Sequence, residues 1–309
     1  MIHRRLLISS LIIVIVLTSM ACARPPRRSQ STQSNERPPT AAIVTGTTPG
    51  DYVEAIAIND QMRHYRLHIP PSYQSGQPMP LVINLHGLNS NAAQQEHVSQ
   101  MSIKADQAGF IVAYPEGLGQ PQTWHIGPRA EDAADSQFIA DLVAHLQDQL
   151  SLDPARIYAT GISNGAQMTN HLGCTMADVF AAIAPVSGGY PPLDDCHPTR
   201  PVSVVAFHGT ADKLLPYEGQ GRMLMPVRDW AAAWAARNGC DLTPTVTFQQ
   251  GEVTGETWSH CQASADVVFY TIQNRGHSWP GSDMPPDITT HDINATDVIG
   301  DFFVAHPRR

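Results

Sequence analysis

Residues 156–168, Arg-Ile-Tyr-Ala-Thr-Gly-Ile-Ser-Asn-Gly-Ala-Gln-Met, constrain the fold of this chain more than any other stretch. A short β-branched and aromatic run ends in Gly-x-Ser-x-Gly, and a helical pattern of small residues follows. Gly161 and Gly165 lack a Cβ, so a strand and a helix can approach closely around a strained Ser163. Such a turn leaves the Asn164 N–H at a helix N-terminus, free to donate to a developing oxyanion. Glycine and serine also make ordinary turns, so the motif indicates a nucleophile only together with its flanking strand and helix.

The length and charge of the chain limit what this serine could act on. A chain of 309 residues, 42% of them apolar, is enough for one substantial core, and we expect a single large α/β domain. Residues 1–48 carry six arginines and one glutamate, so residues 49–309 hold 13 basic and 27 acidic groups, a net charge of −14. So acidic a surface disfavours nucleic acid and anionic lipid as partners, and it favours a neutral substrate.

Residues 1–23 are predicted to be a signal peptide rather than part of the fold. A positive segment, His3–Arg5, precedes an apolar run, Leu6–Leu17, that is short for a membrane span. Ser19–Ala21 offers a cleavage site of small residues, and Cys22 directly after it raises a second interpretation, a lipoprotein acylated at Cys22. Both interpretations predict export, to the extracellular space or the cell surface. The only membrane contact that we expect is a lipid anchor at Cys22.

The next segment, residues 24–48, is predicted to be a disordered linker. It consists mostly of Arg, Pro, Ser, Gln, Asn and Thr, with one apolar patch at 41–44, and it cannot bury enough apolar surface to fold. Such a linker would connect an anchored N-terminus to the folded domain, which we assign to residues 49–309.

Four cysteines lie in the folded part of the chain, and none has the C-x-x-C spacing that would favour zinc or redox chemistry. An even number in an exported protein suggests two disulfides, and four cysteines allow three connectivities. We expect the sequential pairing, which closes two short loops, with buried free thiols as the alternative. The four are Cys174, Cys196, Cys240 and Cys261.

Strands alternate with helices through most of the folded part, which predicts a mainly parallel sheet with helices on both faces. The domain opens with a β-hairpin over 51–69, and a continuous apolar run such as 80–85 is typical of a strand buried on both faces. A helix is expected at 135–150, with Asp135 as its N-cap. Other helices are expected at 92–108, 226–237 and 293–305, and other strands at 110–114, 179–186, 202–207, 245–249 and 267–272.

Two later segments supply an acid and a base for the serine. Asp212 follows the apolar run at 202–207, and His277 lies in the loop after 267–272. The chain order Ser163, Asp212, His277 is the order that α/β-hydrolases use. In that arrangement His277 takes the Ser163 proton, and Asp212 holds the imidazole tautomer. Taken singly, Asp212 could be a turn or capping aspartate and His277 an ordinary loop histidine, but their joint position after two strand ends favours a triad.

Four motifs together carry a resemblance that covers roughly residues 50–306. They are His86-Gly87, Gly161–Gly165, Phe207–Asp212 with Pro216-Tyr217, and Gly276–Gly281. The chain resembles the polyhydroxybutyrate depolymerase-like esterases, secreted enzymes of the α/β-hydrolase fold that include feruloyl and acetylxylan esterases. The resemblance implies an oxyanion hole built from the backbone N–H groups of Leu88 and Asn164. Leu88 is a departure, because such depolymerases often have cysteine there, and no appended polymer-binding domain is visible.

The remaining candidate residues carry weaker signals. Trp279 is expected to bind substrate by offering an aromatic face to an acyl group, with a place in the core as the alternative. His86 and His208 are expected to shape turns near the site rather than to do chemistry. His64 and His68 are four residues apart on an expected strand, too far to share a metal. No phosphate-binding glycine loop or cluster of metal ligands is visible in the sequence, so we expect no cofactor and no metal.

These features predict an exported, cofactor-free serine esterase. The preferred substrate is a feruloyl or acetyl ester on plant polysaccharide, because the acidic domain disfavours anionic polymers and Trp279 offers an aromatic face. The alternative is a depolymerase of polyhydroxybutyrate or other hydroxyalkanoate oligomers. A non-catalytic binding protein and a peptidase on the same fold are the alternatives of other classes.

Overall fold

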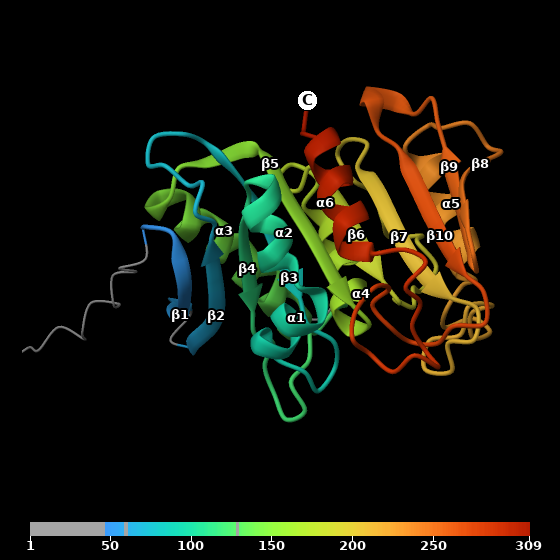
Figure 1. Cartoon of the computed structure of the whole chain (residues 1–309), viewed down its shortest axis with the longest axis horizontal. Coiled ribbons are helices and arrows are strands. Elements are labelled where there is room, and N and C mark those ends of the chain that lie inside the picture. The colour runs from blue at the N-terminus through green and yellow to red at the C-terminus, as the bar shows by residue number, and fades with distance from the viewer. Residues whose placement is uncertain (1–46, 59–60, 128–129) are drawn as a thin grey trace, which may run out of the picture. The chain divides into compact units, whose positions relative to one another are not determined.

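The computed structural model describes residues 47–58, 61–127 and 130–309, and in this part of the chain its main feature is one ten-stranded sheet (Figure 1). The predicted signal peptide, Cys22 and nearly all of the predicted linker lie outside the described residues. The strand order is β1-β2-β4-β3-β5-β6-β7-β10-β9-β8. The strands are β1 Gly50–Ile58, β2 Gln61–Ile69, β3 Met79–Leu85, β4 Ile111–Pro115, β5 Leu152–Ile162, β6 Ala182–Val186, β7 Ser203–Gly209, β8 Thr245–Gln250, β9 Val253–Trp258 and β10 Val267–Ile272.

The centre of the sheet is parallel, as predicted, and its two margins are antiparallel. The parallel strands are β4, β3, β5, β6, β7 and β10. They read as near-continuous apolar runs because both of their faces are covered. The opening hairpin, β1 with β2, pairs antiparallel with β4, and β9 and β8 continue the sheet antiparallel from β10. The strand β9 was not expected, since Gly255 and polar Thr and Glu residues weaken its signal.

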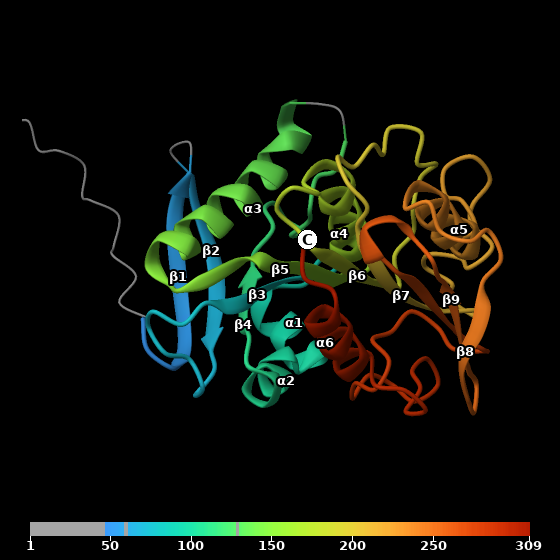
Figure 2. The ribbon, with the colours of Figure 1, turned by 90° about the horizontal axis from the view of Figure 1, so that it is seen from above.

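Helices cover both faces of the sheet, which confirms the predicted layers of an α/β-hydrolase fold (Figure 2). One face carries α3, α4 and α5, and the other carries α1, α2 and α6. Within the described residues, none of the helices has the length and apolar character that a membrane span requires. The helices are α1 Ala92–Ser99, α2 Met101–Ala108, α3 Ala130–Gln149, α4 Asn164–Thr175, α5 Val227–Arg237 and α6 Ala295–Ala305.

Two of the predicted helices differ from the structure in detail. The helix expected over 92–108 is two helices, because Gln100 adopts a left-handed conformation with φ 50 that ends α1 and precedes α2. The helix α3 begins at Ala130, so Asp135 lies inside it and is not its N-cap. The Asp135 carboxylate instead accepts a hydrogen bond from Arg63 of β2 at 2.7 Å, and both side chains are buried.

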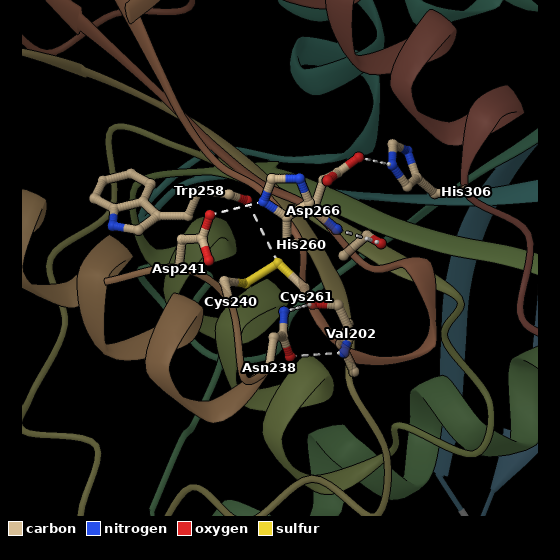
Figure 3. The surroundings of a disulfide bond; sticks show 10 residues. Val202, Asn238, Cys240, Asp241, Trp258, His260, Cys261, Asp266 and His306 are labelled. Atoms are coloured by element: carbon tan, nitrogen blue, oxygen red, sulfur yellow. Dashed lines mark hydrogen bonds and ion pairs between the residues drawn. A yellow bond between two sulfur atoms is a disulfide. The ribbon is translucent and has the colours of Figure 1, made fainter. Parts of the chain in front are cut away.

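Two disulfides join Cys174 to Cys196 and Cys240 to Cys261, which confirms the sequential pairing. Cys174 lies in the last turn of α4, and its partner lies in the loop before β7. Cys240 follows α5, and Cys261 lies in the connection between β9 and β10, where its Sγ is 3.4 Å from the Trp258 carbonyl oxygen (Figure 3). Each bridge therefore joins the end of a helix to a loop that is distant in the sequence.

Candidate active site

Ser163 occupies a strained turn between β5 and α4, near the middle of the sheet (Figure 1). Its backbone has φ 59 and ψ −120, values that a non-glycine residue adopts only at an energetic cost. The close approach of the chain explains the two glycines of the motif. A Cβ on Gly161 would lie 2.6 Å from the Leu85 carbonyl oxygen, and a Cβ on Gly165 would clash with the same atom. The motif thus forms the strand–turn–helix that was predicted for it.

Asp212 and His277 come together at one edge of the sheet, after the parallel neighbours β7 and β10. His277 Nδ1 donates to Asp212 Oδ2 at 2.7 Å, and Asp212 Oδ1 accepts the backbone N–H groups of Leu214 and Leu215, each at 2.9 Å. Burial acts to raise the pKa of Asp212, but the hydrogen bond and the charge of His277 outweigh it and hold this pKa below its ordinary value. The ionised carboxylate keeps the proton of a neutral His277 on Nδ1, which leaves Nε2 free to act as a base.

A cavity of about 590 Å³ takes in both Ser163 and His277. Apart from His277, its wall has no ionisable side chain among the described residues. Amide and hydroxyl side chains line part of the wall, and aliphatic side chains line the rest. Such a wall suits a neutral substrate group better than a charged one. The apolar lining residues are Leu88, Val98, Ile162, Leu214, Leu215 and Met284.

The two N–H groups predicted to form the oxyanion hole have no hydrogen-bond partner among the described residues. Within the described part of the chain, no hydrogen bond uses the backbone N–H of Leu88 or that of Asn164. The Gly87 carbonyl belongs to the same peptide unit as the Leu88 N–H. It accepts hydrogen bonds from His86 Nδ1 at 2.7 Å and from Ser90 N at 3.2 Å. Because a peptide unit is planar, these two bonds also fix the direction of the Leu88 N–H.

His86 is neutral, and one loop holds both its ring and Asn164. Gly117 N donates to His86 Nε2 at 2.9 Å, so the ring proton is on Nδ1, and burial lowers the pKa of His86. Trp124 N donates to Asn164 Oδ1 at 2.7 Å, while Trp124 Nε1 donates to the His86 carbonyl at 2.9 Å. The loop 117–124 therefore holds the ring of His86 and the side chain of Asn164, beside the two N–H groups of the predicted oxyanion hole. The prediction that His86 shapes a turn near the site is confirmed.

Ser187 connects the loop of His277 to the strand beside Ser163. It follows β6 with φ 49, and its side chain is buried. The preceding residue, Val186, accepts the Ser163 N–H on its carbonyl at 3.0 Å. The Ser187 hydroxyl donates to the Ser278 carbonyl at 2.7 Å. Sequence analysis missed this residue, because the bond joins positions 91 apart and carries no local pattern.

The structure contradicts the prediction that Trp279 binds substrate. Its side chain is 0% exposed, and it is not part of the cavity wall. The indole Nε1 donates to Thr296 Oγ1 at 2.9 Å, and the ring belongs to the same core cluster as Ile299 and Phe303 of α6. The alternative interpretation, that Trp279 completes the core, is confirmed.

His208 lies beside Asp212 and is buried with it. Its Nε2 donates to the Leu215 carbonyl at 2.8 Å and is 3.4 Å from Asp212 Oδ2. Burial lowers the pKa of His208, so the ring is neutral at pH 7. It holds the turn that carries Asp212, which confirms its predicted role. Among the residues that the structure describes, no group of three or more His, Cys, Asp or Glu is arranged to hold a metal ion.

The mainly parallel sheet, its two helical layers and the strained turn at Ser163 define an α/β-hydrolase. Among solved structures, an acetyl xylan esterase from Aspergillus awamori superposes with a TM-score of 0.63. The match covers 82% of this chain and 99% of that chain at 18% sequence identity, and at this identity it supports the fold alone.

Sequence comparison gives the family. Residues 63–197 match the family described as esterase PHB depolymerase. Feruloyl esterase B of Piromyces equi is 33% identical over 228 residues, which are 68% of this chain and 41% of that protein's length. The putative esterase NocK of Nocardia uniformis subsp. tsuyamanensis is 28% identical over 283 residues, 81% of each chain. Over the matched residues the chain is similar to this family of esterases.

Proposed function

We propose that the chain is a carboxylic ester hydrolase with Ser163 as nucleophile, His277 as general base and Asp212 as the group that orients the base. The observation that carries this proposal is that the strained Ser163 and the Asp212-bound His277 open on one cavity. Backbone strain of this kind persists only where the surrounding structure maintains it, and a binding protein without chemistry has no use for it beside an oriented imidazole.

The proposed reaction passes through an acyl-enzyme. His277 Nε2 accepts the Ser163 proton as Oγ bonds to the ester carbonyl carbon, and the resulting oxyanion is held by the N–H groups of Leu88 and Asn164. The C–O bond to the alcohol then breaks, and His277 gives its proton to the departing alcohol. Water attacks the acyl-enzyme while His277 accepts one of its protons. The bond from the acyl carbon to Ser163 Oγ then breaks, His277 returns the proton to Oγ, and the acid leaves.

Feruloyl or acetyl esters on plant polysaccharide are the proposed substrates, and hydroxyalkanoate oligomers are the second candidate. The feruloyl esterase relative supports the first choice, and the depolymerase description of the family supports the second. The uncharged cavity wall supports a neutral acyl group in both cases. With Trp279 in the core, no tryptophan, tyrosine or phenylalanine remains among the described wall residues to favour a ferulate ring.

The proposed place of action is outside the cytoplasm, in the extracellular space or at the cell surface. Two disulfides support this, because such bonds persist in oxidising compartments. Acylation of Cys22 is the proposed route to retention at the surface. Mass spectrometry of the mature N-terminus, from secreted and membrane fractions, distinguishes an acylated Cys22 from a cleaved and released chain.

The test of activity uses 4-nitrophenyl acetate and a fluorophosphonate probe. We expect turnover and covalent labelling, with both lost in Ser163→Ala. If the folded protein shows neither, the hypothesis of a binding protein replaces the esterase. Cleavage of chromogenic peptides in preference to esters would instead support a peptidase.

The substrate order is tested by comparing kcat/KM for methyl ferulate, 4-nitrophenyl acetate and a hydroxybutyrate trimer. We expect methyl ferulate or the acetyl ester to be preferred to the trimer. A clear preference for the trimer would reverse the order of the two substrate classes and leave the catalytic mechanism unchanged.

A further inference from the structure

Three buried polar side chains form a hydrogen-bonded chain that ends at the cavity wall. Ser99, Asn84 and Gln95 are 1%, 0% and 2% exposed. Asn84 Nδ2 donates to Ser99 Oγ at 3.0 Å, and Gln95 Nε2 donates to Asn84 Oδ1 at 2.8 Å. Gln95, on α1, is the member of this chain that lines the cavity with Ser163. A polar chain in an otherwise apolar layer is costly unless each of its groups is paired.

The carbonyl oxygen of Gln95 and the second N–H of its Nε2 are left without a partner among the described residues. An amide side chain has an acceptor oxygen and two N–H donors. Within the described residues, the only hydrogen bond of the Gln95 side chain is the one from Nε2 to Asn84. If both amides were reversed, the chain of bonds would survive and both N–H groups of Gln95 would be left over instead. A hydroxyl group complements either arrangement, because it both donates and accepts.

Aliphatic side chains share the cavity wall with Gln95. Val98 is three residues further along α1, on the same face of the helix, and both Val98 and Met284 pack against the core cluster that contains Ile162. This part of the cavity therefore suits an apolar group that carries a single hydroxyl. The alcohol side of a polymeric ester stays attached to its polymer outside the protein, so the acyl group is the part that can enter a buried end of the cavity.

We propose that Gln95 is a specificity-determining residue that binds a hydroxyl group on the acyl part of the ester. The proposal rests on the proposed ester hydrolysis at Ser163 and narrows its substrates to neutral hydroxyacyl esters. A hydroxyl on an alkyl chain and a hydroxyl on a phenyl ring share this chemistry. The site discriminates against acyl groups that lack the hydroxyl, because such a group would leave the buried amide of Gln95 without a hydrogen-bond partner.

The test compares ester pairs that differ in one hydroxyl. One pair is 4-nitrophenyl 3-hydroxybutyrate and 4-nitrophenyl butyrate, and the other is methyl 4-hydroxycinnamate and methyl cinnamate. For each pair, the ratio of kcat/KM with and without the hydroxyl is measured in the wild type and in Gln95→Leu. We expect this ratio to be about tenfold higher in the wild type for at least one pair, the size of one neutral hydrogen bond. The pair that responds identifies the hydroxyl as alkyl or phenolic.

Gln94→Leu is the matched control, since Gln94 is an exposed amide on the same helix that also lines the cavity, and its oxygen already accepts a hydrogen bond from Ser90. We expect this variant to keep the wild-type ratio. Because Gln95→Leu leaves Asn84 without that partner, the double variant Asn84→Leu/Gln95→Leu is measured as well, with thermal unfolding of both.

The outcomes separate the two proposals. Equal ratios in the wild type and in both Gln95 variants, with esters still hydrolysed, would overturn the role of Gln95 and leave the esterase intact. A loss of the ratio in Gln94→Leu as well would also overturn it, because hydroxyl recognition would then not be specific to Gln95. If the wild type hydrolyses no ester, the proposed function fails, and the role of Gln95 fails with it.

Discussion

Ser163 and Ser187 both have positive φ, at 59 and 49, and they follow the adjacent parallel strands β5 and β6. The strain at Ser163 exposes its hydroxyl to the cavity, whereas the strain at Ser187 turns its hydroxyl toward the loop of His277. The proposed nucleophile and the proposed base thus depend on two neighbouring turns of one rigid sheet, which can maintain a fixed geometry between them.

Removing a member of the proposed triad should stop turnover without unfolding the protein. Ser163→Ala and His277→Ala should each lower kcat by about four to six powers of ten, and Asp212→Asn somewhat less, because triad members act as a unit. Initial rates on 4-nitrophenyl acetate measure the loss, with thermal unfolding as the control for folding. Near-normal activity in His277→Ala would make the assignment of the base wrong, and His208 would be the next residue to change.

Variants of Ser187 should separate its hydroxyl from its backbone strain. Ser187→Ala removes the hydroxyl and keeps the strain, whereas Ser187→Gly removes both. The glycine variant should be more stable than the alanine variant by about 1 kcal/mol, because glycine adopts this φ without a penalty. Both should lose roughly tenfold in kcat, the size of one hydrogen bond that holds the His277 loop. Kinetics and urea unfolding of the two variants measure this, and activity that simply tracked stability would refute a positioning role.

At the level of single residues, the sequence predicted the positions of side chains that lie in recognisable motifs. It did not predict the side chains whose positions depend on tertiary packing. Ser163 and His277 were found because each lies in a recognisable local pattern after a strand. Trp279 is only two residues beyond His277, yet its side chain turns into the core under α6. Gln95 lies in no motif, and its proposed role depends on a hydrogen bond to Asn84 of β3 that only the structure shows. Side-chain direction in loops is set by tertiary contacts that no local pattern records.

Among the elements, the buried parallel strands were the most predictable and the boundaries of helices the least. A short, continuous apolar run is typical of a strand whose two faces are both covered, so β3 and β6 could be predicted from the sequence. The break between α1 and α2 was not, because Gln100 is neither glycine nor proline and yet takes the left-handed conformation. The start of α3 was predicted at Asp135 because aspartate is frequent at N-caps, but the carboxylate of this residue forms an ion pair with Arg63 of β2.

The contact between β2 and α3 should depend on both members of this ion pair. Arg63 and Asp135 are 3% and 1% exposed at their side chains, so losing one partner leaves a buried charge uncompensated. Arg63→Met should therefore lower the free energy of unfolding by about 3–5 kcal/mol, and the double variant Arg63→Met/Asp135→Leu should recover part of that loss. Urea unfolding of the two variants and of Asp135→Leu gives a double-mutant cycle. Strictly additive losses would mean that the two side chains do not act as a pair.

At the scale of the whole domain, the disulfides should contribute to stability by restricting the unfolded chain. The bridges join residues 22 and 21 apart, and loops of this size predict about 3 kcal/mol for each. Changing the cysteines of either bridge to alanine should lower the free energy of unfolding by about that amount. The variant that lacks both bridges should be insensitive to a reducing agent, which serves as the control. Unfolding that is unaffected by the loss of a bridge would contradict the prediction.

The dependence of stability on pH should follow from groups whose folded and unfolded pKa values differ. Burial lowers the pKa of His86 and of His208 below 6.5, and the pKa of Asp212 is held below 3.8. Below each ordinary value the unfolded chain binds a proton that the folded chain does not, so each group makes the folded state less stable as the pH falls. The histidines act below about pH 6.5, and Asp212 acts below about pH 4.

His208 and His260 offer variants with opposite signs. The pKa of His260 is raised by its hydrogen bond with Asp241, so its contribution is present below pH 6.5 and is lost as the pH rises. Free energies of unfolding measured between pH 7.5 and 5 should therefore fall less steeply toward acid in His208→Gln than in the wild type. In His260→Gln they should fall more steeply. The slope of the unfolding free energy against pH depends on the difference in the number of protons that the unfolded and folded states bind. Each variant therefore isolates the contribution of one histidine to this slope. A slope that His208→Gln left unchanged would show that the buried ring takes up its proton at the same pH in the folded and unfolded chains. At acid pH a cationic imidazole beside Asp212 would then compete with His277 for its carboxylate.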